Sequence, residues 1–441
     1  MNDLFSEREW FGEFYIPGQY EKRFPGKLVY SPESGVRLNY SITGQDVPTG
    51  SEELHGVLHT GDKCTLIGRL AAEYAGFTYR KGLHSRHGIF GFRSLLLGDF
   101  SSHDELFFDL EFSLVNMQEF FFPIGHKDRI RYSDKPLFSL KTSYGEIEID
   151  NRATFGYLLS DITSQIYNWD PSALEELKNA FAAIKATHPK SLFMLKNDIR
   201  YHIRLKIDAG ATFGDAYAHI TNIANLFALL IHCPVYPETI YLVKKENSDR
   251  PLLIEVFPSM VLDKRTITIC KADRSHFSMP ITQFNVDLPG IMKSWLETPL
   301  KYGTVITAIQ HKTGIRDLHS LHGDIVLYAT QFDSISHEAG IDPVEKYTYP
   351  LKTFSSYKVI SGVQKILSNV GESDFGKGIA DLRNEIAHVG KPKRLLAALT
   401  IRDLGRLTQF MEVTVLGSIL TTLGVKKDVI EHYQDISTPD V

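Results

Sequence analysis

The sequence predicts an α+β protein of several domains, in which a β-rich N-terminal region precedes an all-α helical bundle. Three observations support this class. Short apolar runs broken by Gly, Pro, Asn and Asp fill the first 150 residues, strand and helix patterns mix over the next 150, and helical spacing dominates the rest. The predicted domains are therefore 1–150, its α+β continuation 151–299, and a helical bundle over 300–441.

The first of these ranges has the two-residue period of half-buried strands. Residues 106–114 and 145–149 alternate apolar with charged or polar side chains, and turn-forming residues separate such runs. This pattern predicts an antiparallel sandwich or barrel with a few helices.

The middle range contains two clear helices among further strands. Asp170 and Pro171 form a typical helix start, and the helix is expected to end near Thr187, before Pro189. Residues 213–231 read as a buried helix. Strands are expected at 199–207, 239–244 and 252–257.

The last range predicts four or five helices, enough for a small bundle. Apolar residues step by three or four along the first helix, at Leu318, Leu321, Ile325, Tyr328, Phe332 and Ile335. A second helix covers residues 360–370, a third 375–388, and a long last helix 395–423. The last helix is apolar around much of its circumference, which predicts packing against a second subunit or against the N-terminal region.

The composition excludes a largely disordered chain and a protein that is basic over its whole surface. With 43% hydrophobic residues, 23% charged residues and a formal net charge of −5, the chain is globular and not basic overall. Any nucleic-acid site must be local, and between Lys377 and Arg406 seven basic residues oppose three acidic ones, a net +4. Such a run is also typical of a solvent-exposed helix face that binds nothing. Three dispersed cysteines without a CxxC pair predict a reducing compartment and no zinc ribbon.

No segment predicts contact with a membrane. The N-terminal residues lack an apolar stretch of signal-peptide type, and polar residues interrupt the helix at 213–232. We therefore expect a soluble, cytoplasmic protein.

One string in the C-terminal region carries recognisable chemistry. Arg383, Asn384 and His388 lie within a predicted helix that Gly390 and Pro392 terminate. Arginine supplies a planar cation for a phosphate, and histidine moves a proton near neutral pH. The negative end of the helix dipole favours imidazolium at position 388. The basic residues Lys391, Lys393 and Arg394 follow directly and are candidate contacts for RNA phosphates.

This motif resembles that of the HEPN superfamily, which is Arg, a polar residue, three further residues and His. More narrowly, the chain resembles the ApeA family of bacterial phage-defence proteins, in which a β-rich domain precedes a C-terminal HEPN domain. The N-terminal resemblance lies in residues 10–12 (WFG), 24–28 (FPGKL), 54–58 (LHGVL) and 64–66 (CTL). The resemblance implies ribonuclease activity and a composite site at a dimer interface. It also implies a supporting acid, for which Asp333 is the candidate.

Helical geometry agrees with a composite site. Five residues rotate by about 500°, which leaves Arg383 and His388 roughly 140° apart, so one copy clamps one phosphate poorly. Two copies across a twofold axis would surround a cleft. His388 would move protons at the 2'-hydroxyl and the leaving 5'-oxygen, and Arg383 would stabilise the phosphorane. Asn384 would orient the imidazole. The products would be a 2',3'-cyclic phosphate and a 5'-hydroxyl.

Each of these residues also has a purely structural explanation, which remains open. Arg383 would pair with Asp381 or another acid, and His388 would only cap the end of the helix. His319 and His322 are three apart without a third metal ligand, and no Walker lysine, dinucleotide-binding glycine pattern or Gly-x-Ser-x-Gly elbow occurs. The sequence therefore predicts no cofactor and no metal.

Two functional hypotheses follow. The first is a metal-independent endoribonuclease of an abortive-infection type of phage defence, which self-associates, cuts RNA, and responds to a phage-derived trigger sensed by the N-terminal region. The alternative is a non-catalytic dimerisation or binding module with a ligand- or protein-sensing β-rich region.

Overall fold

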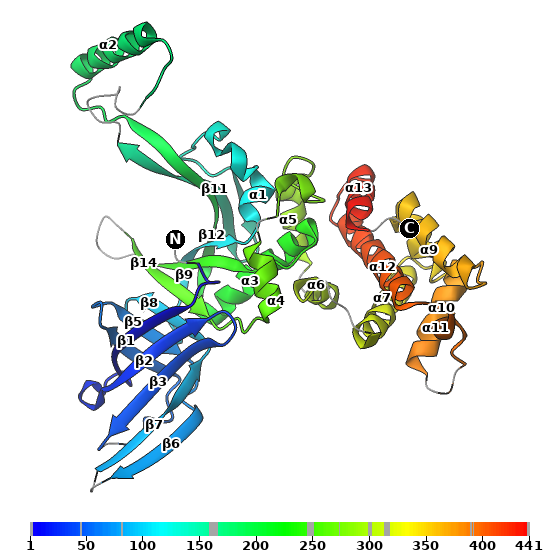
Figure 1. Cartoon of the computed structure of the whole chain (residues 1–441), viewed down its shortest axis with the longest axis horizontal. Helices are drawn as coiled ribbons and strands as arrows, with labels where there is room; N and C mark the ends of the chain where they lie inside the picture. The colour runs from blue at the N-terminus through cyan, green and yellow to red at the C-terminus, as the bar shows by residue number, and fades with distance from the viewer. Residues whose placement is uncertain are drawn as a thin grey trace.

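A computed structural model of the chain describes residues 3–44, 46–80, 83–157, 166–244, 251–272, 274–298, 302–312, 318–388, 390 and 392–438. Within these ranges the chain forms a large sheet with helices packed on it, followed by a helical bundle (Figure 1). The β-rich region and the following helical region are thereby confirmed.

The strands are β1 (Arg8–Tyr15), β2 (Phe24–Ser31), β3 (Gly35–Thr43), β4 (Glu53–Leu58), β5 (Lys63–Ile67), β6 (Ala72–Arg80), β7 (Leu83–Phe92), β8 (Ser94–Gly98), β9 (Phe107–Leu114), β10 (Phe138–Thr142), β11 (Gly145–Tyr157), β12 (Met194–Ala211), β13 (Pro237–Lys244) and β14 (Leu252–Pro258).

The helices of the N-terminal region are α1 (Met117–Phe121), α2 (Pro171–Thr187), α3 (Phe213–Ile231), α4 (Lys264–Lys271), α5 (Leu288–Glu297) and α6 (Gly303–Gln310). Those of the bundle are α7 (Leu318–Glu338), α8 (Thr348–Phe354), α9 (Tyr357–Asn369), α10 (Phe375–Ala387), α11 (Arg394–Ala398), α12 (Ile401–Thr422) and α13 (Lys427–Ser437).

All the strands belong to one 14-stranded sheet in the order β10-β11-β12-β9-β13-β14-β8-β5-β4-β1-β2-β3-β7-β6. Neighbouring strands are antiparallel. Strands from the middle of the sequence insert between earlier ones, since β12 pairs with β9 and β14 pairs with β8. The first 150 residues and the following segment therefore share one sheet.

The sheet curls but does not close into a barrel. The hydroxyl of Ser259, directly after β14, accepts a hydrogen bond from the Val36 amide of β3 (2.8 Å) and donates one to the Phe92 carbonyl at the end of β7 (2.6 Å). A Cβ atom on Gly35 (φ +73°) would lie 2.5 Å from the Ser259 hydroxyl oxygen, so this approach requires glycine. The described part of the chain thus forms one curled, open sheet with β10 and β6 as its edge strands.

Two predicted helices appear where expected. Helix α3 starts at the N-cap Thr212, runs to Ile231, and is buried over most of its length. Helix α2 starts at Pro171 behind the N-cap Asp170 and ends at Thr187, and it stands away from the sheet at the tip of the β11–β12 hairpin (Figure 1). Within the described ranges, no helix is long and apolar enough to cross a membrane.

The C-terminal bundle differs from its prediction at its end. The expected helix over residues 395–423 is two helices, α11 and α12, and α13 follows as an additional helix. The break has a local cause, because Thr400 and Asp403 form a reciprocal capping box that starts α12. This capping signal lies within an apolar stretch and did not enter the sequence-based prediction.

Helix α12 is the buried centre of the bundle. Nine of its apolar side chains are each at most 2% exposed, and Ile401 in the first turn is the exposed one; the nine are Leu404, Leu407, Phe410, Met411, Val413, Val415, Leu416, Ile419 and Leu420. Helices α7, α8, α9 and α13 pack against it within the single chain. The apolar circumference of α12 thus requires no second subunit, and it gives no support to the predicted dimer.

A buried charged cluster joins the N-terminal region to the bundle. The Lys312 ammonium, two residues after α6, lies 3.0 and 3.2 Å from the carboxylate oxygens of Glu412 on α12. His232, at the end of α3, lies 3.1 Å from the same ammonium through Nε2. The Tyr433 hydroxyl of α13 donates to the Leu229 carbonyl of α3 (2.9 Å). Bundle and sheet region are therefore linked by buried polar contacts.

Two buried histidines should make the protein acid-sensitive. Burial lowers the pKa of His232 and of His202 to about 4, against about 6.5 in an unfolded chain. Between these values the unfolded chain binds protons that the folded chain does not. The free energy of unfolding should therefore fall as pH falls from 6.5 towards 4, by up to ~1.4 kcal/mol per pH unit for each histidine.

Urea unfolding at pH 7.5, 6.0 and 5.0 measures this effect. His202→Gln removes one titrating group, and His232→Asn removes the other while tolerating the left-handed backbone there (φ 56°). Each variant should lose less stability than wild type between pH 7.5 and 5.0. An unchanged pH dependence in both variants would contradict the assignment.

Candidate active site

The predicted motif lies at the exposed end of α10. The Asp374 side chain caps the start of this helix by accepting from the Lys377 amide (3.0 Å). The helix ends at Ala387, and His388 is its C-cap with extended backbone angles (φ −121°, ψ 113°). The His388 amide still donates to the Asn384 carbonyl (3.1 Å). His388 thus lies one helical turn after Asn384, with its side chain exposed.

Arg383 is held by its neighbour in the motif. Its Nη1 donates to the Asn384 Oδ1 atom (3.2 Å), and both residues are half-buried. Among the residues that the structure describes, no carboxylate lies within ion-pair distance of Arg383. The alternative pairing with Asp381 does not occur, because the Asp381 carboxylate lies 4.0 Å from Arg394. Asn384 therefore orients the guanidinium, where the sequence had predicted that it would orient the imidazole.

The segment after His388 is fixed by the lysine that follows. The Lys393 ammonium donates to the His388 carbonyl (2.9 Å) and to the Glu385 carbonyl. These are carbonyls that a helix end leaves without partners. Lys393 therefore anchors the histidine backbone, a role that the sequence reading did not assign. Lys391, the neighbouring candidate for RNA binding, lies outside the described residues.

Arg394, the third basic candidate, is part of a structural ion pair. Its Nη2 lies 3.0 Å from Glu372, a nearly buried acid that also lies 3.6 Å from Lys377. The Arg394 side chain remains half-exposed. Much of its charge is balanced within the bundle, so its predicted contact with RNA has weaker support than that of Lys393.

Asp333 does not reach the motif. It lies on α7 and pairs with Lys346 (3.0 Å), whose ammonium also lies over the Tyr347 ring. No contact between Asp333 and Arg383 is present in the described parts of the chain. Asp333 therefore holds the segment after α7, and the structure gives no support to its expected role as an orienting acid.

Glu385 was missed by the sequence reading and is central to the site. It is 6% exposed, and its carboxylate accepts hydrogen bonds from the amides of Leu395 (2.9 Å) and Leu396 (3.0 Å). These amides begin α11, where backbone donors lack helical partners. The buried acid thus fixes α11 against the motif helix. A glutamate two residues after the arginine, ahead of an apolar helix start, was the available signal.

Replacing Glu385 by alanine should therefore destabilise the protein. Two backbone amides lose their acceptor, at a cost of about 1–2 kcal/mol. Glu385→Gln keeps one carbonyl oxygen and should cost less. Urea unfolding measures both, with Glu176→Ala on the exposed face of α2 as the control for removal of an acid. Equal stability of Glu385→Ala and the control would disprove the capping role.

The described residues contain no cluster of three or more His, Cys, Asp or Glu side chains that could hold a metal ion. His319 and His322 lie on α7 without such a group, and the three cysteines are buried and unbonded to one another.

The fold and the motif together define a β-rich domain followed by a HEPN-type helical domain. Comparison with protein families agrees, because the model described as ApeA N-terminal domain 1 matches residues 9–295 and the model described as Apea-like HEPN matches residues 345–429. The chain belongs to the ApeA family. Searches of the curated proteins and of the solved structures gave no significant match. The matched HEPN domain supports a nuclease-like defence protein.

Proposed function

We propose that the chain is a metal-independent endoribonuclease of an abortive-infection type of phage defence, acting in the cytoplasm. One observation carries the proposal. The Arg383 guanidinium is held by Asn384 and faces no carboxylate among the described residues, and an exposed histidine follows at the end of the same helix. A cation that is oriented by a neutral amide and faces no carboxylate in the described part of the chain, next to a proton-transfer group, suits a phosphodiester.

The reaction would use the substrate's own 2'-hydroxyl as nucleophile. His388 removes its proton or protonates the leaving 5'-oxygen, and Arg383 stabilises the phosphorane. The products are a 2',3'-cyclic phosphate and a 5'-hydroxyl, and DNA is not cut because it lacks the 2'-hydroxyl. Two copies of the chain would place one histidine at the 2'-hydroxyl and the other at the leaving 5'-oxygen, so the active form is a homodimer or a larger even oligomer.

The surroundings of the motif would hold RNA. Lys393 contacts the His388 backbone, and Lys391 lies between these two residues in the sequence. Both lysines would bind RNA phosphates next to the histidine. The N-terminal sheet would sense a phage-derived trigger, and the buried contacts between Lys312 and Glu412 provide a physical link to the bundle.

Purified protein incubated with RNA in EDTA tests the proposal. Cleavage that leaves cyclic-phosphate ends, with an all-DNA oligonucleotide uncut, supports the enzyme. The assay should be repeated with extract from infected cells, because a trigger-dependent enzyme is silent without its trigger. Binding of RNA without cleavage under both conditions would favour the alternative, a non-catalytic binding module.

A further inference from the structure

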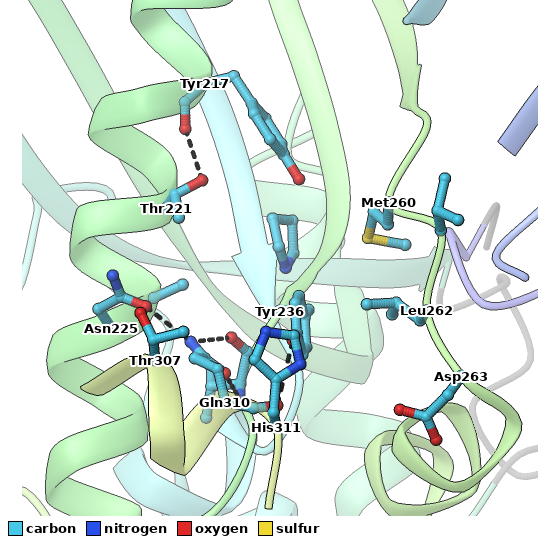
Figure 2. A pocket seen from close by; sticks show the side chains of 14 residues that line it. Tyr217, Thr221, Asn225, Tyr236, Met260, Leu262, Asp263, Thr307, Gln310 and His311 are labelled. Atoms are coloured by element: carbon cyan, nitrogen blue, oxygen red, sulfur yellow. Dashed lines mark hydrogen bonds between the residues drawn. The ribbon is translucent and has the colours of Figure 1, made fainter. Parts of the chain in front are cut away.

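A cavity of about 440 Å³ lies far from the motif, between α3, the start of β13, the segment after β14, and α6 (Figure 2). Its size falls within the range of small-molecule sites, roughly 300–1,000 Å³. Tyr217 and Tyr236 line it with aromatic rings, and Met260 and Leu262 add apolar surface. Such a lining fits a planar, mostly apolar ligand.

Hydrogen bonds hold the floor of the cavity together. Gln310, which is 7% exposed, accepts a hydrogen bond from the Val235 amide (2.8 Å) and donates to the Val235 carbonyl (2.9 Å) and to Asn225 Oδ1 (2.9 Å). The Tyr236 hydroxyl donates to the Gln310 carbonyl (3.1 Å). These bonds tie α6 to α3 and to the segment before β13. The floor is therefore preformed and supplies shape, since its polar groups are already engaged.

Two groups remain available for recognition. The Tyr217 hydroxyl points into the cavity, and no hydrogen-bond partner for it is found in the part of the chain that the structure describes (Figure 2). At the mouth stands the exposed carboxylate of Asp263, which accepts hydrogen bonds from the Arg265 and Thr266 amides and the Thr266 hydroxyl, so that one of its about four acceptor positions is left for a ligand. Hydrogen bonds from the Thr266 side chain and backbone, with a smaller contribution from His311, hold the pKa of Asp263 below its ordinary value. Asp263 is therefore an anionic acceptor at neutral pH.

The lining excludes phosphorylated ligands. Among the described residues that line the cavity there is no lysine or arginine, and an anionic carboxylate at the mouth repels a phosphate. Aromatic rings, a donor from a hydroxyl and a carboxylate acceptor together suit the faces and edge of a nitrogen heterocycle. We propose that this cavity binds a nucleobase or unphosphorylated nucleoside, with one of its N–H groups donating to the remaining acceptor position of Asp263 and a ring acceptor receiving the hydrogen bond of the Tyr217 hydroxyl.

The cavity is connected to the bundle by one short segment. His311 lines the cavity, and the next residue, Lys312, carries the ammonium bound to Glu412 of α12. Helix α12 packs on α7, and α7 packs on the motif helix α10. A ligand that moves α6 therefore displaces the cation bound to α12. This regulatory part of the inference rests on the proposed ribonuclease function, while the binding part does not.

Titration calorimetry on the full chain tests the binding part. The probes are adenosine, guanosine, cytidine, uridine, the free bases and the 5'-monophosphates. At least one nucleoside or base should bind, and its monophosphate should bind at least tenfold more weakly. Asp263→Asn should weaken binding at least tenfold, and Tyr217→Phe severalfold. No binding by any nucleoside or base at millimolar concentration, or equal binding of the monophosphate, overturns the proposal.

Matched controls separate recognition from folding. Asp263 is also the N-cap of α4, and asparagine caps helices equally well, so Asp263→Asn should keep that helix. Asp170→Asn makes the same change at the N-cap of α2, far from the cavity, and should leave binding unchanged. Tyr357→Phe serves likewise for Tyr217→Phe, because Tyr357 is 85% exposed. Equal loss of affinity in the control variants would count against the site.

Hydrogen exchange tests the regulatory part without any nuclease assay. Bound ligand should change amide exchange in α12 severalfold in wild type, and much less in Glu412→Gln. Ligand binding without any change in the exchange of α12 would disprove the coupling between the cavity and the bundle, while the proposed binding site would stand. If the ligand binds and alters α12 but no RNA is ever cut, the proposed ribonuclease function and its regulation fail, while the binding site and its coupling to α12 stand.

Discussion

Replacing His388 by alanine is expected to lower RNA cleavage by at least ~100-fold, the usual contribution of a positioned acid or base. The fold should survive, because the side chain is exposed and the two bonds at this residue are made by its backbone amide and carbonyl. Stability should therefore stay within about 0.5 kcal/mol of wild type. His337→Ala is the matched control, since His337 is an exposed histidine in the last turn of α7.

Arg383→Ala should have a comparable effect for a different reason. Loss of the group that stabilises phosphorane charge costs about 10²- to 10³-fold in rate. Arg383→Lys keeps the positive charge but loses the planar fork that bonds Asn384 and a phosphate together, so it should recover only part of the activity. Rate constants for a labelled RNA, measured in EDTA, compare all four variants with wild type.

Mixed subunits distinguish a composite site from a single-chain site. If one copy supplies the arginine and the other the histidine, Arg383→Ala and His388→Ala chains should regain partial activity when combined. A protein that stays monomeric at micromolar concentration and cleaves at full rate would contradict the composite site. Full activity in both single variants would disprove the roles of Arg383 and His388 altogether.

Local sequence signals predicted local structure well. Asp170 and Pro171 marked the start of α2, the apolar run after Thr212 marked α3, and the end of the motif helix fell within one residue of His388. The first helix had a cap and a terminating proline in its sequence, the second had only its apolar pattern, and the third had the terminating residues Gly390 and Pro392. The family was likewise predicted from the motif and a few N-terminal strings, and the family comparisons confirm it.

Non-local contacts could not be predicted in the same way. The order of the sheet places β14 next to β8 and β12 next to β9, and no periodicity encodes such pairings. Within the site, Lys393 read as a phosphate contact because it is basic and follows the histidine. In the structure the Lys393 ammonium also binds two backbone carbonyls, and the Glu385 carboxylate caps the start of α11. A charge is visible in sequence, but its partner depends on the packing.

The contact between Lys312 and Glu412 carries the second large prediction. Glu412 is fully buried, and Lys312 lies 3.0 and 3.2 Å from its two oxygens. Removing one member of such a pair leaves a buried charge poorly compensated and typically costs 3–5 kcal/mol. Lys312→Met should therefore lower the free energy of unfolding by about 3 kcal/mol at pH 8, as measured by urea unfolding.

His232 makes that loss depend on pH. Burial, and then the nearby Lys312 charge, lower the pKa of His232 to about 4, so it is neutral in wild type. Without Lys312 its pKa rises, and below this new value His232 becomes a cation 3.6 Å from Glu412. The cost of Lys312→Met should accordingly be smaller at pH 5.5 than at pH 8. Adding His232→Asn to Lys312→Met should remove this difference.

A double variant isolates the pair itself. Apolar replacement of both partners in a buried ion pair is often close to neutral, so Lys312→Met with Glu412→Leu should recover at least ~1.5 kcal/mol relative to the sum of the single variants. Additive losses would show that the two charges do not stabilise one another. Because Lys312 lies between the segments matched by the two family models, a strong coupling would also mean that the sheet region and the bundle unfold together. Under the proposed function, such coupling is the mechanical condition for a trigger bound by the sheet region to affect Arg383 and His388.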